Sequence, residues 1–240
     1  ISFIRVMDNG KGMTRADALL ACNRYATSKL YDESDLFRIG TLGFRGEALP
    51  SIASVSELTL ITGNGKEGTN LHYKGGKLIE EKKAPVQQGT DISVKSLFFN
   101  TPARFKYLKS ESTELSHSVN YIGKTALANL HIAFKLVNNG RVQFQSVGDG
   151  NILRVISALY GFENAKKMIN CTYEDGYVSL KLCMSQPEVS QGTNNSVTII
   201  VNNRVVKNTE LVKAIITGYE TYLPVNRYPV AVLKLTVDPF

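Results

Sequence analysis

Glycines at a regular three-residue spacing mark the first stretch of this sequence whose residue types could do chemistry. Gly40, Gly43 and Gly46 are followed by an apolar, helix-compatible run at 48–55. A glycine-rich loop that leads into a helix presents bare backbone N–H groups and the positive end of the helix dipole, a combination that binds phosphate. The loop is not a Walker P-loop, because no Gly-Lys-Ser/Thr follows at the required offset, and its spacing differs from G-x-G-x-x-G. Such glycines also occur in plain surface loops, so the phosphate interpretation needs a second motif.

The second motif lies upstream, in Asp8-Asn9-Gly10-Lys11-Gly12-Met13. It follows a strand-like run at 1–7, so Asp8 stands at a strand end. A carboxylate there can accept a hydrogen bond from an exocyclic amine such as N6 of adenine. Gly10 and Gly12 leave room for a flat base, and Met13 supplies a soft apolar wall. The alternative is an Asx-turn that simply ends the strand, as any Asp-Asn-Gly sequence can make.

Between these two motifs, Ala26-Thr27-Ser28-Lys29 places two hydroxyls and an ammonium in a row. These groups are well suited to phosphate oxygens, although an ordinary helix end with a C-terminal lysine would have the same residues. The polar stretch 31–38 and the glycine loop together predict a lid over a bound ligand. Base pocket, phosphate hydroxyls and glycine lid thus occur in a functional order, which favours a nucleotide site.

The elements that must position these motifs form two successive sets of strands and helices. Alternating apolar patterns predict strands, and apolar residues at three- and four-residue steps predict helices. In the first set, strands are predicted at 1–7, 58–62, 69–73, 77–81 and 92–97, with helices at 14–22 and 47–55. In the second, helices are predicted at 114–129, 151–159 and 210–222, with strands at 132–138, 142–146, 177–184, 196–201 and 230–237. This pattern predicts an α+β fold whose first half is a mixed or antiparallel sheet covered by helices on one face.

Composition and charge exclude several classes of protein. The chain has 240 residues, 43% apolar and 20% charged, as expected for a globular protein with one large or two ordinary domains. It contains no apolar run of membrane-spanning length and no signal peptide, and its start at Ile1 suggests a piece of a longer protein. The three cysteines and three histidines are scattered, so no zinc site or nucleophilic triad is predicted, and the sparse cysteines fit a reducing compartment. The net charge of +7 favours an anionic partner.

Four short motifs together resemble one known family, the MutL-type DNA mismatch repair proteins of the GHKL ATPase superfamily. They are Asp8-Asn9-Gly10-Lys11-Gly12-Met13, Ala26-Thr27-Ser28-Lys29, Leu42-Gly43-Phe44-Arg45-Gly46-Glu47-Ala48-Leu49 and Leu97-Phe98-Phe99-Asn100-Thr101-Pro102-Ala103-Arg104. The first motif is shared by the superfamily, whereas the second, the third and the Asn-Thr-Pro-Ala-Arg string are specific to MutL-type proteins. The resemblance extends over the whole chain, to the terminal Val237-Asp238-Pro239.

The resemblance implies a GHKL (Bergerat-type) ATP-binding α/β sandwich at 1–97, followed by a ribosomal-protein-S5-like α/β domain at 98–240. Asp8 would bind the adenine amine. Gly10, Gly12 and Met13 would shape the base pocket, and Thr90 would lie beside the base. The triphosphate would be held and covered by residues of the second and third motifs: Thr27, Ser28, Lys29, Leu42, Gly43, Phe44, Arg45, Gly46, Glu47, Ala48 and Leu49.

The resemblance also implies ATP and Mg²⁺ as cofactors, but it assigns no catalytic or metal-binding residue within this chain. The family's general base and its Mg²⁺-ligating asparagine lie on a helix before the first motif, and its γ-phosphate-sensing lysine lies beyond Phe240. We therefore expect this chain to bind nucleotide weakly and not to turn it over. Glu47 could serve as a substitute base, although a glutamate at a helix start more often caps the loop. Tyr25 replaces the family's usual histidine, which affects the expected lid contacts.

For the parent protein, the resemblance implies slow ATP hydrolysis that times a conformational change and the dimerisation of two N-terminal regions. This change would couple a mismatch-recognition protein of the MutS type to strand removal. The location would be the cytoplasm of a bacterium or the nucleus of a eukaryote, with no membrane involved. Sequence-independent DNA binding that falls steeply with salt is also expected. The candidate phosphate contacts are Arg104, Lys106, Lys109, Arg204, Lys207 and Lys213.

Two alternatives from other classes remain open. An ATPase subunit of a type II topoisomerase shares the first motif and the two-domain plan, but it lacks the Asn-Thr-Pro-Ala-Arg string. A non-catalytic ATP-gated interaction module would carry the same nucleotide motifs without the upstream glutamate and asparagine.

Overall fold

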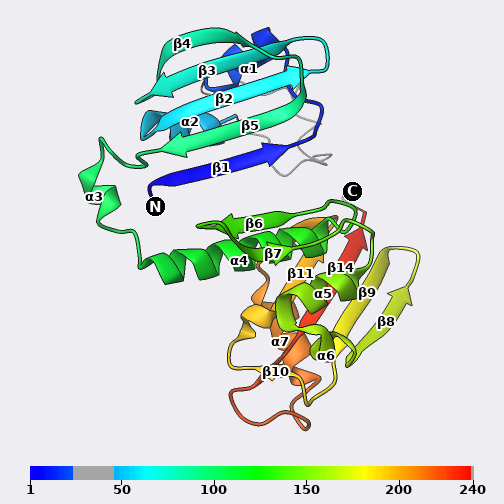
Figure 1. The fold of residues 1–240 in the computed structure, drawn as a ribbon. Coiled ribbons are helices and arrows are strands. Elements are labelled where there is room, and N and C mark those ends of the chain that lie inside the picture. Colours follow the sequence, from blue (N-terminus) through cyan, green and yellow to red (C-terminus); the bar gives the residue numbers. More distant parts are fainter. Residues whose placement is uncertain (24–45, 239–240) are drawn as a thin grey trace. The chain divides into compact units, whose positions relative to one another are not determined.

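A computed structural model of the chain describes residues 1–23 and 46–238. The chain divides into two compact units, Ile1–Glu111 and Ser112–Phe240, and each is described by itself. Mixed helices and strands run through both units (Figure 1), as the α+β prediction requires. The functional boundary expected between residues 97 and 98 stays a prediction. None of the helices in the described ranges is long and apolar enough to cross a membrane.

The first unit is a five-stranded antiparallel sheet with two helices on one face (Figure 1). Its elements are β1 (Phe3–Asp8), α1 (Arg15–Ala21), α2 (Ala48–Ser54), β2 (Glu57–Asn64), β3 (Gly68–Lys74), β4 (Lys77–Ala84), β5 (Gln88–Lys95) and the short α3 (Pro102–Phe105). The strand order is β1-β5-β2-β3-β4, and every neighbouring pair is antiparallel. The predicted arrangement of the first half is therefore confirmed.

One face of this sheet carries the core of the unit. Along β2, Leu58, Leu60 and Thr62 are buried, whereas the residues between them are half-buried. This alternation of buried and exposed positions is what a sheet covered on one side requires. Ala18 of α1 and Ala53 of α2 pack against the buried residues and complete the cluster.

The second unit has a five-stranded mixed sheet of order β12-β11-β14-β9-β8. Its elements are α4 (Glu111–Ala128), β6 (Lys135–Asn138), β7 (Arg141–Gln145), α5 (Ile152–Tyr160), α6 (Phe162–Ala165), β8 (Met168–Glu174), β9 (Val178–Ser185), β10 (Ser190–Gln191), η2 (Asn194–Ser196), β11 (Val197–Val201), β12 (Arg204–Val206), α7 (Thr209–Thr217), β13 (Tyr228–Pro229) and β14 (Ala231–Val237). Strands β11 and β14 run parallel, and the other neighbours in this sheet are antiparallel.

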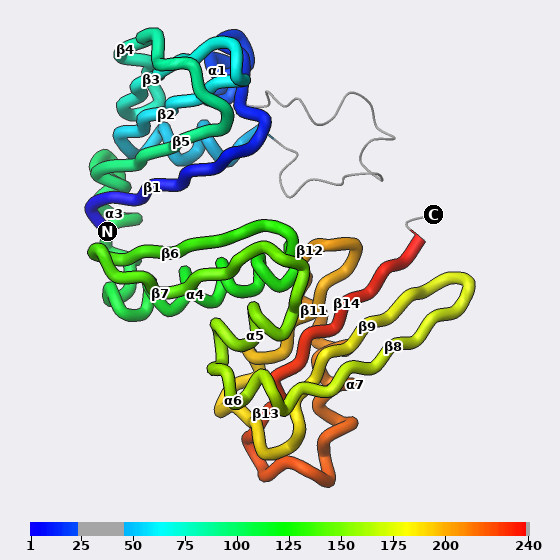
Figure 2. The backbone as a smooth tube through the Cα atoms, turned by 45° about the vertical axis from the view of Figure 1, so that its right-hand side comes forward, coloured from blue at the N-terminus to red at the C-terminus, as the bar shows by residue number. Residues whose placement is uncertain are grey.

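Both faces of the second sheet are covered (Figure 2). Ile200 belongs to a cluster with residues of α4 and α5, while Ile199 belongs to a second cluster that includes Leu211 and Ile215 of α7. Successive residues of β11 are therefore buried on opposite sides, and its first four residues are all buried. A continuous apolar strand is typical of a sheet covered on both faces.

The structure of the second unit differs from the sequence prediction at two places. Strand β8 was not predicted, although Ile169, Cys171 and Tyr173 alternate with polar residues along it, and six of its seven residues are exposed. The helix predicted at 210–222 ends at Thr217. Beyond it the chain makes tighter turns, in which the Tyr219 N–H donates to Ile216 O at 2.9 Å and the Tyr222 N–H to Tyr219 O at 2.8 Å.

Candidate functional site

The predicted base-binding residues meet at one end of the first sheet, on its helix-covered face. Strand register aligns three cross-strand rows over β1, β5 and β2. The rows, each written in the order β1, β5, β2, are Ile4/Val94/Leu58, Val6/Ile92/Leu60 and Asp8/Thr90/Thr62. The first two rows are apolar and the third is polar. The structure therefore brings Asp8 and Thr90 together as direct cross-strand neighbours, where the apolar core ends.

Thr62 is the central residue of the polar row, and the sequence analysis missed it. Its buried hydroxyl accepts a hydrogen bond from Met13 N at 3.1 Å, donates to Gly89 O at 3.1 Å, and lies 3.1 Å from Thr90 Oγ1. It ties the turn after β1 to the ends of β2 and β5. In the sequence, Thr62 follows Leu60 by two residues and therefore falls on the same strand face as Leu58 and Leu60. Its hydrogen-bond partners could be identified only from the strand register.

Two glycines let the backbones around this row approach closely. Gly12 has φ +64°, and a Cβ there would lie 1.8 Å from the carbonyl oxygen of Gly63. Gly89 has φ +110°, and a Cβ there would lie 2.1 Å from the carbonyl oxygen of Asp8. No side chain fits at either position without moving backbone, so glycine is required for this packing.

Asp8 makes the local turn that the sequence offered as the alternative interpretation. Its Oδ1 accepts a hydrogen bond from Gly10 N at 2.9 Å, which is an Asx-turn. A carboxylate accepts through both oxygens, and among the described residues Oδ2 has no partner. The turn and a ligand contact are therefore compatible, because each uses a different oxygen.

The phosphate side of the predicted site is only partly within the described ranges. Thr27, Ser28, Lys29, Leu42, Gly43, Phe44 and Arg45 lie outside them. Gly46 has φ +63°, and Glu47 is the N-cap of α2 but makes no side-chain cap hydrogen bond. Ala48 begins the helix and Leu49 packs against the core of the first unit.

The candidate DNA contacts fall into two sets, one in each unit. Arg104, Lys106 and Lys109 lie in or just after α3, and Arg204, Lys207 and Lys213 lie on β12, before α7 and on α7. All six except Arg204 are exposed. Lys124 of α4 lies near the second set, since burial and then the charge of Lys207 lower the pKa of its ammonium. No sequence signal links Lys124 to Lys207, because the fold alone brings these positions together.

No catalytic or metal centre emerges from the described residues. Within them, no group of three or more His, Cys, Asp or Glu side chains could hold a metal ion. Burial raises the pKa of the Cys22 and Cys183 thiols to about 11, so neither is an activated nucleophile. The described part of the site consists of an acceptor carboxylate, a hydroxyl pair and close-packed backbone.

Comparisons with known proteins agree on one family. A family model described as "DNA mismatch repair protein, C-terminal domain" matches residues 156–240. Proteins named DNA mismatch repair protein MutL from Lactiplantibacillus plantarum and Anoxybacillus flavithermus are 45% and 51% identical over 100% and 98% of this chain. This chain spans 35% and 39% of those two proteins, little more than a third of their length.

Solved structures share the fold over nearly the whole chain. The Aquifex aeolicus MutL ATPase domain complexed with ADP has a TM-score of 0.70 at 24% identity, covering 100% of this chain and 81% of that chain. A structure described as the N-terminal domain of a DNA repair protein has a TM-score of 0.81 at 22% identity, covering 99% of this chain and 75% of that chain. The chain therefore has the same α+β fold as these two solved structures.

Proposed function

The chain belongs to the MutL family of DNA mismatch repair proteins, and from that premise we propose that residues 1–97 bind an adenine nucleotide. The observation that carries the proposal is the polar row of Asp8, Thr90 and Thr62 at the end of the first sheet. Asp8 Oδ2 accepts the exocyclic amine of adenine while Oδ1 holds the turn. A related ATPase domain is known in complex with ADP, which supports the same ligand class here.

The remaining predicted contacts complete this proposal. Gly10, Gly12 and Met13 border the base, and the phosphates lie toward the N-terminus of α2. Residues 27–29 and 42–49 hold and cover the phosphates, with Mg²⁺ neutralising their charge when it is bound. No described residue is assigned to the metal. Residues 98–240 form the S5-like domain that completes the functional unit.

For the whole protein we propose slow ATP hydrolysis that drives dimerisation and couples a mismatch-recognition protein of the MutS type to strand removal. The proposed location is the cytoplasm of a bacterium, since the relatives compared above are bacterial. Sequence-independent DNA binding through Arg104, Lys106, Lys109, Arg204, Lys207 and Lys213 belongs to the same proposal. A binding constant for duplex DNA that does not change with salt would remove it.

The nucleotide proposal is tested with Asp8→Asn. The asparagine Oδ1 still accepts from Gly10 N, but an NH₂ group replaces the second acceptor oxygen and faces the donor amine of adenine. We expect calorimetric affinity for ATP and ADP to fall at least about tenfold, with stability changed by less than about 0.5 kcal/mol. The matched control is Asp17→Asn at an exposed position of α1, which leaves nucleotide affinity unchanged.

Two results would contradict the proposal. One is equal nucleotide affinity in the parent chain and Asp8→Asn. The other is an affinity for guanine nucleotides equal to that for adenine nucleotides, since guanine presents a carbonyl oxygen where adenine has its amine. A loss of affinity accompanied by a lower unfolding midpoint would instead assign Asp8 to the turn alone.

A further inference from the structure

The outer edge of the second sheet is formed by a long strand with little charge. Strand β8 is outermost in the order β12-β11-β14-β9-β8, and it lies along the free side of the β8–β9 hairpin (Figures 1 and 2). It has seven residues, and Glu174 is the only charged one. An exposed edge of this kind presents unpaired backbone N–H and C=O groups to any further strand.

Another edge in the chain is protected in the usual way. Strand β4 ends the first sheet, and five of its eight residues are charged. Its Lys82 and Glu80 form an ion pair with Nζ and Oε1 2.7 Å apart. Charged side chains on an edge strand oppose pairing with other chains. Strand β8 lacks this protection over six consecutive residues, which marks it as an edge able to pair.

One face of β8 is apolar and exposed. Ile169 is 44% and Tyr173 58% exposed, and Cys171 lies between them on the same face. In the register with β9, these residues stand opposite Met184, Leu182 and Leu180, which are half-buried and pack against the core cluster that contains Ile199, so the exposed apolar surface lies on β8 itself. A further strand beside β8 would extend this surface and bury part of it.

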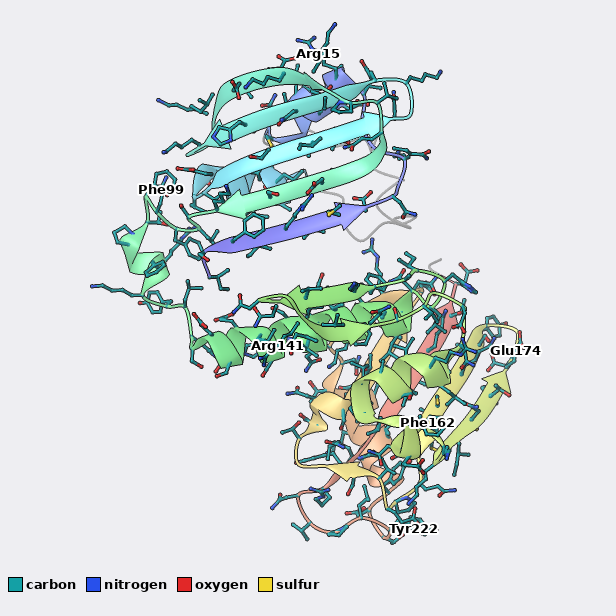
Figure 3. All side chains as sticks on the ribbon, viewed as in Figure 1. Arg15, Phe99, Arg141, Phe162, Glu174 and Tyr222 are labelled. Carbon is teal, nitrogen blue, oxygen red and sulfur yellow. The ribbon has the colours of Figure 1, made fainter. Side chains whose placement is uncertain are left out.

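Opposite charges stand at the two ends of β8. Lys167 precedes the strand and Asp175 follows it, next to Glu174 at the hairpin turn (Figure 3). Asp175 Oδ1 accepts hydrogen bonds from Tyr177 N and Val178 N, both at 2.9 Å, which lower the pKa of its carboxyl and keep it ionised. The strand is therefore charge-complementary to a reversed copy of itself.

We propose that β8 pairs antiparallel with β8 of a second copy of this chain, around a two-fold axis at Cys171. In this register Ile169 stands opposite the second copy's Tyr173, and Lys167 opposite its Asp175. The two sheets join into one continuous sheet. The association needs no nucleotide, so it goes beyond the proposed function and does not rest on it.

The pairing is weak and depends on concentration. A seven-residue edge and its adjoining side chains bury far less than the roughly 1,200–2,000 Å² of stable interfaces. Sedimentation analysis of the nucleotide-free chain, from low micromolar to submillimolar concentration, is therefore expected to show a reversible monomer–dimer equilibrium.

The register is tested with two double variants at exposed positions. Ile169→Lys with Tyr173→Lys places like charges opposite each other at two points, and we expect the dissociation constant to rise at least about tenfold. Ile169→Lys with Tyr173→Glu places opposite charges at the same points and restores association. Thermal unfolding monitored by circular dichroism confirms that both variants fold.

A short bis-maleimide supplies an independent readout at the axis. Cross-linked dimer should form through Cys171, disappear in Cys171→Ser, and persist in Cys183→Ser, whose thiol is buried. Any of three results would overturn the proposal. The chain stays monomeric at every concentration, the dimer survives in the two-lysine variant, or only a strand from a different protein pairs with β8. All of these measurements are made without nucleotide, and Asp8→Asn leaves their results unchanged, so failure here is distinct from failure of the nucleotide proposal.

Discussion

The two sheets have the same number of strands but bury them differently. The first is antiparallel and packs its core against helices on one face, so buried and half-buried positions alternate along β2. The second contains a parallel pair and has a core cluster on each face, so β11 is buried without interruption. The difference in packing therefore shows in the residue pattern of the strands, which alternates in a sheet covered on one face and is continuously apolar in a sheet covered on both.

Buried hydroxyls show the same contrast. Thr62 in the first sheet uses its hydroxyl to hold Met13 N and Gly89 O at the proposed site. Thr198 in the second sheet is 1% exposed, and its Oγ1 has no hydrogen-bond partner among residues 1–23 and 46–238. A buried threonine is therefore part of a polar network in one sheet and a space-filling residue in the other.

The largest predicted effect on the free energy of unfolding comes from comparing one isoleucine in each sheet. Ile199→Ala removes a side chain that is 1% exposed in the second sheet, and we expect a loss of about 3 kcal/mol. Ile61→Ala acts on a half-buried position facing away from the helices, and we expect a loss of about 1 kcal/mol or less. Chemical denaturation, with hydrogen exchange to assign each transition to a unit, measures both. Equal losses would break the contrast between one-sided and two-sided packing.

An intermediate effect distinguishes the two buried threonines. Thr62→Val leaves the Met13 N–H without its acceptor, and we expect a loss of about 1–3 kcal/mol together with weaker nucleotide binding. Thr198→Val removes an unpaired hydroxyl, and we expect no loss or a gain of up to about 1 kcal/mol. The same denaturation measurements apply. A destabilising Thr198→Val would show that its hydroxyl has a role in the second sheet.

The smallest predicted effect concerns acid sensitivity at one carboxylate in each unit, Glu57 in the first and Asp175 in the second. The hydrogen bond and charge of Lys74 lower the pKa of Glu57 below 4.5, and backbone hydrogen bonds from Tyr177 and Val178 lower that of Asp175 below 3.8. Each interaction stabilises the fold above the ordinary pKa and is lost as pH falls through the lowered value. Titration of the Tyr177 and Val178 amide chemical shifts should give a midpoint below 3.8. A midpoint at or above that value would show that the turn does not favour the ionised form.

Local sequence patterns predicted most helices and strands of the first unit, whereas they did not predict parts of the second unit. Alternating apolar residues predicted the strands of the first sheet, and the helix predicted at 14–22 is present as α1, which Thr14 caps by accepting from Asp17 N at 3.1 Å. Strand β8 was missed although Ile169, Cys171 and Tyr173 alternate with polar residues, because three such positions in a short, mostly exposed edge strand give only a weak apolar pattern. The predicted end of α7 was too late because apolar spacing continues into turns that no longer form a helix.

The sequence by itself determined the family and the residue types of the candidate site, because Asp8, the glycines and the hydroxyl cluster lie in short contiguous motifs whose chemistry is local. Only the tertiary structure decided that Thr62 joins Asp8 and Thr90 in one row, since that depends on the register of three strands far apart in the chain. It also decided which glycines are required by packing, because Gly12 approaches Gly63 only after the sheet has formed.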